Sequence, residues 1–255
     1  MSLNKISKVT KSMVSMNNLS GQKIEKKPKN ILSLTEMLDY LSEITEEEWG
    51  FYAFSRDPLR GKFLDQEQLR LTHLAIACGE NEANKIIESC HETDLKQVAN
   101  FLKLEVNYPR IPQNASQVLF AEYRYPNKIW VYQDCIEKIT NVIVKEGLDQ
   151  LLSPALIQDL LLGHEIFHHI ELNNKDTIFT QIEKVELWMP KPFKNRSTIR
   201  CLGEIAAMSF SKTLNQVSLS PFVLDVVLVY GYSKEAAYCL FEEIMELTKK
   251  TQIGF

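Results

Sequence analysis

Hydrophobic residues recur at the three- and four-residue spacing of amphipathic helices over most of the chain. Turn and capping residues separate these stretches: Gly79 and Gly147 are placed to end helices, and Ser153-Pro154 is placed to begin one. A break is also expected near Cys90-His91. The pattern predicts helices over 33–49, 64–78, 81–103, 135–147, 153–172, 198–215, 219–229 and 234–249.

The middle of the chain has the pattern of short strands. The helix that ends near residue 103 runs into a strand-like stretch over 104–108. Residues 117–125 and 129–132 are also strand-like, and the Pro126-Asn127-Lys128 sequence between them predicts a turn. The chain is therefore expected to adopt an α+β fold that is mostly helical, with a small β-sheet that includes a hairpin.

The N-terminal residues differ in composition from the rest of the chain, which suggests a division into a tail, a helical extension and a main domain. Residues 1–30 contain seven lysines against the single acidic residue Glu25, and few bulky apolar residues. This composition predicts a flexible basic tail. The alternative is a basic arm that docks on an acidic partner or nucleic acid. Residues 31–94 are predicted to form a helical extension, and residues 95–255 the main domain.

Overall composition narrows the class of protein. The chain is 45% hydrophobic and 24% charged, as soluble globular proteins are, and its net charge of −4 argues against nucleic-acid binding. No apolar run approaches the roughly 20 residues of a membrane span, and the N-terminus lacks the apolar core of a secretory signal. The five cysteines are scattered without a C-x-x-C pair, so we expect reduced thiols and a cytoplasmic location.

Residues 160–170 contain the pattern His164-Glu165-x-x-His168 within an apolar helix. Side chains at positions i and i+4 lie one above the other on a helix, so both imidazoles can bind one metal ion from the same side. Glu165 is rotated by about 100° from His164 and can hold a water molecule beside the metal. The motif therefore predicts a zinc centre with Glu165 as the general base of a hydrolase.

Other interpretations of these histidines remain open. The motif fixes only three positions, so His164 and His168 could also be a histidine pair in the core or a decayed site. His169 is turned away from His168 by the helical step and is expected near the solvent or behind the ligands. His73 stands alone and is expected to have a surface or packing role.

A catalytic zinc ion keeps three protein ligands, so a third one is needed. The candidates are Glu171, Glu183, Glu186 and Glu204. Glu171 is expected to point away from the metal, and Glu183 and Glu186 lie in a connection without a recognisable helical frame. Glu204 is favoured, because its helix contains small residues that permit close packing against the zinc helix, namely Gly203, Ala206 and Ala207.

The order of these elements resembles the ImmA/IrrE family of zinc metallopeptidases. A helix and strand, a hairpin, a helix and the HExxH helix precede the sequence Glu204-x-x-Ala207-x-x-Phe210. The stretch from Val223 to Leu240 is similar to the helix-turn-helix-like pair at the C-terminus of that family. The resemblance covers about residues 95–250, and Met208 and Ser211 depart from the residues common in the family.

This resemblance implies a zincin-like fold with zinc held by His164, His168 and Glu204 and with Glu165 as the base. It also implies a cytosolic peptidase that cuts a specific protein, often a regulatory one. The alternative function is a non-catalytic regulatory or interaction protein that retains the fold.

Two features near the motif are left without an assigned role. The donor that would stabilise the oxyanion is not determined by the sequence, and Tyr230, Tyr232 and Arg200 are the candidates. The long connection over 173–197 contains Trp188–Phe193 and could form a substrate wall or an ordinary surface excursion.

Overall fold

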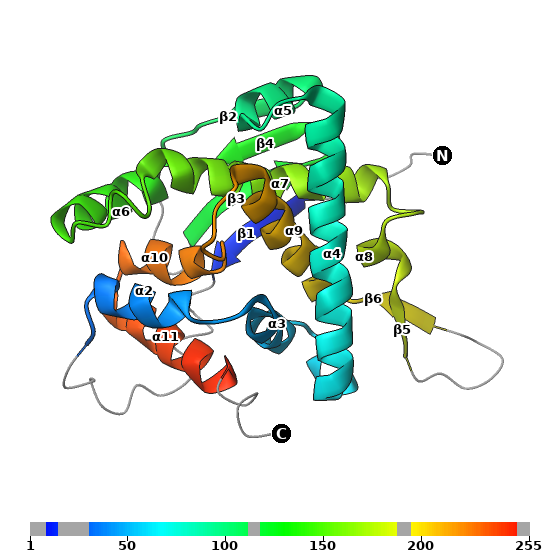
Figure 1. Ribbon diagram of the computed structural model, residues 1–255, viewed down its shortest axis with the longest axis horizontal. Coiled ribbons are helices and arrows are strands. Elements are labelled where there is room, and N and C mark those ends of the chain that lie inside the picture. Colours follow the sequence, from blue (N-terminus) through cyan, green and yellow to red (C-terminus); the bar gives the residue numbers. More distant parts are fainter. Residues whose placement is uncertain (1–8, 15–30, 112–117, 188–194, 249–255) are drawn as a thin grey trace.

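The computed structural model describes residues 9–14, 31–111, 118–187 and 195–248, which form an α+β fold that is mostly helical with a small sheet (Figure 1). The predicted fold class is confirmed at this level. None of the helices in the described ranges combines the length and apolarity that a membrane crossing needs.

The first predicted helix is two helices, α2 (Leu34–Ser42) and α3 (Glu46–Ser55). Thr45 accepts a hydrogen bond from the backbone N–H of Glu48, whose side chain accepts one from the backbone N–H of Thr45. This capping box begins a new helix inside the range that was predicted as a single helix, 33–49. The short 3₁₀ helix η1 (Arg60–Lys62) follows.

The second and third predicted helices are wrongly divided at Gly79. Helix α4 (Asp65–Cys90) passes through that residue, and it ends where His91 takes a left-handed conformation with φ of 56°. A Cβ atom at Gly79 would lie 2.2 Å from the carbonyl oxygen of Ala206. Gly79 therefore lets α4 pack closely against α9 (Arg200–Asn215), rather than ending a helix. The predicted break near Cys90-His91 is confirmed, and α5 (Leu95–Phe101) follows it.

The sheet has the strand order β1-β3-β4-β2 (Figure 1). Strands β3 (Val118–Arg124) and β4 (Lys128–Val131) form the predicted hairpin, and β2 (Glu105–Asn107) pairs with β4 in parallel. Strand β1 (Val9–Val14) pairs antiparallel with β3. The prediction of a flexible tail is therefore wrong for these six residues, because their partner strand lies more than a hundred residues away in the sequence.

The remaining predicted helices are confirmed, with small shifts at their ends. They are α6 (Gln133–Lys145), α7 (Pro154–Asn173), α9, α10 (Val223–Tyr230) and α11 (Lys234–Thr248). Ser153 caps α7 by accepting a hydrogen bond from the backbone N–H of Leu156, and Pro154 occupies its first turn.

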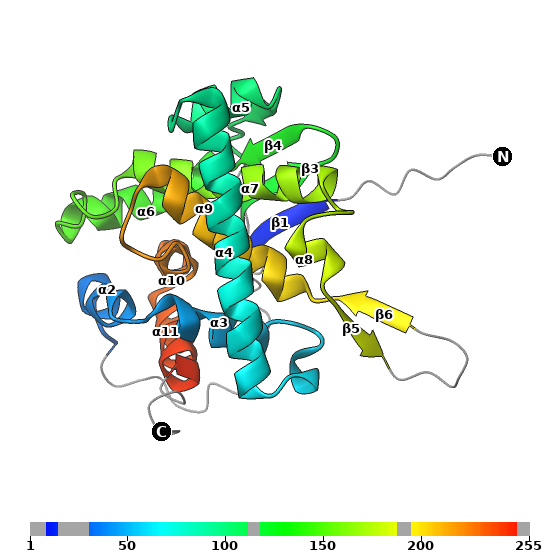
Figure 2. The same ribbon diagram turned by 45° about the vertical axis from the view of Figure 1, so that its right-hand side comes forward.

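The predicted connection over 173–197 contains regular structure. Helix α8 (Phe179–Ile182) is followed by β5 (Lys184–Leu187) and β6 (Asn195–Thr198), which pair antiparallel as a separate two-stranded sheet. Figure 2 shows this pair beyond α8, on the side of the molecule away from α2. The aromatic and proline-rich sequence Trp188–Phe193 lies outside the described residues.

The predicted helical extension shares one hydrophobic core with the rest of the chain, from Leu34 to Ile244. Trp49 of α3 is fully buried and stacks on Phe222, just before α10, at a centroid distance of 5.4 Å. Tyr52 and Phe54 of the same helix are also buried, and the Tyr52 ring lies 5.7 Å from that of Trp49. The extension thus helps to hold in place the helices that carry the motif residues.

Candidate metal centre

Two glycines bring α7 and α9 into close contact. A Cβ atom at Gly163 of α7 would lie 2.8 Å from Oγ of Ser211, and that hydroxyl donates a hydrogen bond to the carbonyl of Leu160 at 2.7 Å. A Cβ atom at Gly203 of α9 would lie 2.7 Å from Oε1 of Glu171. Side chains at either position would push the helices apart, so small residues here set the width of the site.

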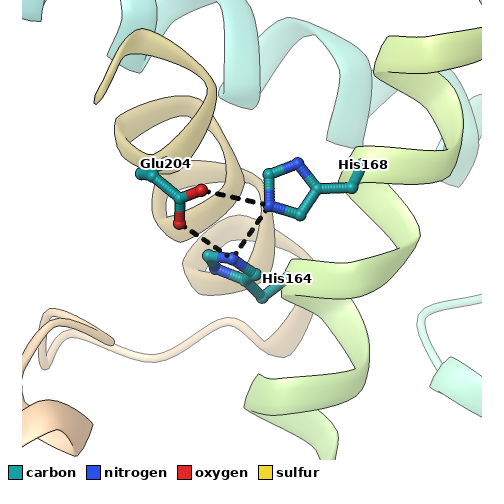
Figure 3. Close-up of side chains that lie close together, drawn as sticks. All are labelled: His164, His168 and Glu204. Atoms are coloured by element: carbon teal, nitrogen blue, oxygen red, sulfur yellow. Dashed lines mark hydrogen bonds and ion pairs between the residues drawn. The ribbon is translucent and has the colours of Figure 1, made fainter. Parts of the chain in front are cut away.

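The close packing brings His164 and His168 of α7 together with Glu204 of α9 (Figure 3). The Nε2 atoms of the two histidines lie 3.1 Å apart. Nε2 of His164 is 3.3 Å from Oε2 of Glu204, and Nε2 of His168 is 3.6 Å from Oε1. The structure therefore gathers the three residues that were selected from the sequence as metal ligands.

These separations fit a single tetrahedral ion. Two ligand atoms that each lie about 2.0–2.1 Å from a zinc ion, with a tetrahedral angle between them, are about 3.3–3.4 Å apart. The two Nε2 atoms are 3.1 Å apart, and each lies 3.3–3.6 Å from one of the two carboxylate oxygens of Glu204, which is close to this value. Two imidazoles and a carboxylate are also a donor set that suits zinc. The site can hold a metal ion, and its geometry requires no large movement to do so.

The site is buried on the side of α7 and open on the side of α9. The side chains of His164 and His168 are 3% and 2% exposed, whereas that of Glu204 is 43% exposed. Among the three residues, solvent therefore reaches the cluster mainly at Glu204.

Glu171 supports the second histidine from behind. Its Oε2 lies 3.2 Å from Nδ1 of His168, and its Oε1 accepts a hydrogen bond from the Thr180 hydroxyl at 2.6 Å. A carboxylate on Nδ1 fixes the tautomer that leaves Nε2 free to bind a metal. The expectation that Glu171 points away from the metal position was therefore incomplete: it is not part of the candidate ligand group, but it contacts His168, which is. Its i+3 spacing from His168 was the available signal.

The pKa values of His168, Glu171 and Glu204 are shifted by this arrangement. Burial lowers the pKa of His168, but Glu171 and Glu204 outweigh it and raise that pKa to about 9. Burial acts in the opposite direction on Glu171 and Glu204, yet the adjacent histidines lower the pKa of both carboxyl groups. The cluster therefore combines ionised carboxylates with imidazole nitrogens, and its negative charge favours a cation at this position.

Glu165 follows His164 on α7 and is fully buried. Its negative charge also contributes to raising the pKa of His168. Glu165 thus remains the candidate for the general base that the sequence predicts.

The other acidic candidates lie elsewhere. Glu183 is 3.7 Å from an Arg70 nitrogen, and Glu186 pairs with Arg196 across the β5–β6 hairpin at 3.0 Å. Neither belongs to the candidate metal-binding group among the described residues.

His73 and His169 lie outside the cluster, as expected. His73 is exposed and lies 3.4 Å from Glu47. Nδ1 of His169 lies 3.2 Å from the hydroxyl of Tyr123 on β3, so this ring faces the sheet and not the ligand cluster.

The candidate oxyanion donors are engaged away from the ligands. The Tyr230 hydroxyl donates to Glu146 at 3.2 Å, and the Tyr232 hydroxyl donates to Asp134 at 2.9 Å. Arg200 is exposed in the first turn of α9. These contacts do not select any of the three as the donor.

Comparisons of this chain with protein-family models, with curated proteins and with solved structures give no match. The functional argument therefore depends on the chemistry of the site itself.

Proposed function

We propose that the chain is a zinc-dependent endopeptidase that hydrolyses a peptide bond of a specific protein. One observation carries the proposal: α7 and α9 bring His164, His168 and Glu204 within 3.1–3.6 Å of one another. The buried Glu165 lies on the same helix as the two histidines. The resemblance of these residues, in this order, to the ImmA/IrrE metallopeptidases supports the same assignment and a zincin-like fold.

Each residue has a role in this proposal. His164, His168 and Glu204 would hold the zinc ion, which supplies Lewis-acid polarisation of a carbonyl group and of water. Glu165 would take a proton from the attacking water and deliver it to the leaving amine. Glu171 would keep His168 in the required tautomer and orientation, with Thr180 fixing the carboxylate in turn.

The substrate would be a protein or peptide that reaches the site over the exposed Glu204. We infer a regulatory protein as the target and the cytoplasm as the location from the family resemblance, together with the scattered cysteines. All five cysteines have free thiols, which agrees with a reducing compartment.

The test is zinc content measured beside peptide cleavage. We expect about one zinc per chain in the wild type, and loss of zinc in His164→Ala and Glu204→Ala. Glu165→Gln is the matched control, because it should keep zinc and lose about 10²–10⁴-fold in cleavage rate. Cleavage is read by mass spectrometry on a peptide pool from a digested whole-cell lysate.

Two results would overturn the proposal. Failure of the wild type to take up zinc after reconstitution would exclude the metal site. Zinc binding without any cleavage that depends on Glu165, in the peptide pool and in an undigested lysate, would favour the alternative of a non-catalytic regulatory or interaction protein.

A further inference from the structure

Strand β1 forms the longest ladder of the four-stranded sheet. It pairs with β3 at six positions, from Val9 opposite Arg124 to Val14 opposite Val118, with an irregularity between Ser12 and Met13. The β3–β4 ladder pairs four positions and the β2–β4 ladder three. A segment from the far N-terminal part of the chain therefore covers the edge of β3 that the local hairpin leaves open (Figure 1).

This edge lies beside the helix that carries the candidate ligands. Both β1 and β3 contact α7. Thr10 of β1 is paired with Tyr123 of β3, and the Tyr123 hydroxyl lies 3.2 Å from Nδ1 of His169, the residue that follows His168. A chain that runs along this edge of β3 thus passes along α7, the helix that carries the two histidines proposed as zinc ligands.

Strand edges are general docking sites for extended peptides. Without β1, one side of β3 would present a row of unpaired backbone N–H and C=O groups. An extended peptide can add to such a row through main-chain hydrogen bonds that do not depend on its side chains. An endopeptidase needs this kind of binding, because it must hold a substrate backbone straight and in register beside the catalytic groups.

Strand β1 leaves the ligand cluster accessible. The Glu204 side chain remains 43% exposed with β1 in place. Strand β1 therefore covers the edge on which a substrate backbone would lie, and does not close off the metal position. Zinc binding and substrate binding are thereby separable.

We propose that β1 occupies the position of an extended polypeptide substrate on β3, so that β1 must leave before a substrate strand can add there. This inference depends on the proposed peptidase function for its catalytic meaning. It identifies the substrate class as a polypeptide that is extended where it is cut, and it identifies β1 as a built-in competitor of that substrate.

The experiment weakens β1 in the full-length chain. Thr10→Pro with Lys11→Pro removes the backbone donors of two consecutive residues, one of which faces β3 because N–H groups alternate between the two sides of a strand, and Thr10→Ala with Lys11→Ala is the matched control that keeps both N–H groups. The probe is a fluorescein-labelled peptide with the sequence of residues 7–16. We expect the proline variant to bind it at least about tenfold more tightly than the wild type or the alanine control, because the competing strand no longer occupies the edge.

Zinc content is measured in the same samples and should be equal in all three proteins. An equal peptide affinity in the three proteins, with zinc and fold retained, would overturn the proposal and make β1 a permanent structural strand. Absence of zinc in all three would instead contradict the peptidase function, and the peptide affinities would still report on β1.

A second measurement on the wild type avoids dependence on the folding of the variants. Excess unlabelled peptide should displace β1 and speed amide hydrogen exchange at Val9–Val14, while β3 stays protected by the added strand. If exchange at Val9–Val14 stays unchanged at saturating peptide, β1 does not compete for that edge and the proposal fails.

Discussion

Two adjacent histidines of α7 show how differently its two sides are built. His168 lies between Glu171 at its Nδ1 and Glu204 near its Nε2, and these carboxylates raise its pKa to about 9 against the effect of burial. His169 faces the sheet, where its Nδ1 meets the hydroxyl of Tyr123, and burial lowers its pKa.

His168 is buried and His169 is half-buried, and burial acts in the same direction on the pKa of both rings, so it does not explain why the two pKa values shift in opposite directions. The difference lies in the groups that face each ring. The α9 side supplies negative charge, which attracts a cation, while the sheet side supplies a neutral hydroxyl. The HExxH spacing matters because it turns both histidines towards the side that has the carboxylates.

The largest expected effect tests the difference between His168 and His169 directly. His168→Ala should reduce zinc affinity by more than 100-fold, because loss of a ligand exceeds the 10–100-fold effect typical of outer-shell residues. His169→Ala is the matched control and should keep about one zinc per chain. The measurement is competition with a chelator of known affinity. Equal losses in the two variants would mean that the two sides of α7 do not differ in function.

Glu171 tests whether the support behind His168 is as important as its position suggests. Glu171→Gln should lower zinc affinity about 10–100-fold, since the amide cannot hold Nδ1 as the carboxylate does. Glu183→Gln is the control, because this carboxylate lies by Arg70 and outside the ligand cluster. An unchanged affinity in Glu171→Gln would show that His168 is oriented by packing alone. A loss in Glu183→Gln would reopen the identity of the third ligand.

The sequence is sufficient to predict those parts of the molecule whose structure depends on neighbouring residues. The ends of α7 follow from Ser153 and Pro154, and its ligand spacing follows from helix geometry. Glu204 could be selected because small residues flank it. In each case, neighbouring residues of the chain carry the information.

The misassigned elements depend on contacts between distant parts of the chain. Gly79 resembles a helix end, but it serves the close approach of Ala206, far along the chain. The lysine-rich composition of residues 1–30 hides the pairing of β1 with β3. Composition does not contain these two contacts. Glu171 differs, because it was judged by its direction from the metal, although the i+3 spacing that brings it to the ring of His168 is present in the sequence.

The next expected effect concerns the space between α7 and α9. Gly203→Ala would place a methyl group 2.7 Å from Oε1 of Glu171, so either the carboxylate or the helix must move. Overpacking of this kind costs about 1–3 kcal/mol of unfolding free energy, and zinc affinity should fall with it. Gly61→Ala is the control, since nothing lies within 4 Å of its Cβ position. Urea denaturation and zinc titration measure the two effects. Unchanged values for Gly203→Ala would show that Glu171 has room to adjust.

The smallest expected effect concerns the side of α7 that faces the sheet. Tyr123→Phe removes a hydroxyl that donates to the carbonyl of Pro126 and lies 3.2 Å from Nδ1 of His169. Loss of these hydrogen bonds should cost about 0.5–1.5 kcal/mol of unfolding free energy, and Tyr125→Phe, at an exposed position, should cost less.

Zinc affinity should not change in Tyr123→Phe, because the hydroxyl contacts His169 and not a ligand. A clear drop in zinc affinity with little loss of stability would mean that the sheet acts on the ligands through α7. The two sides of the helix would then form one coupled site, and the pairing of strands along β3 would bear directly on the metal centre.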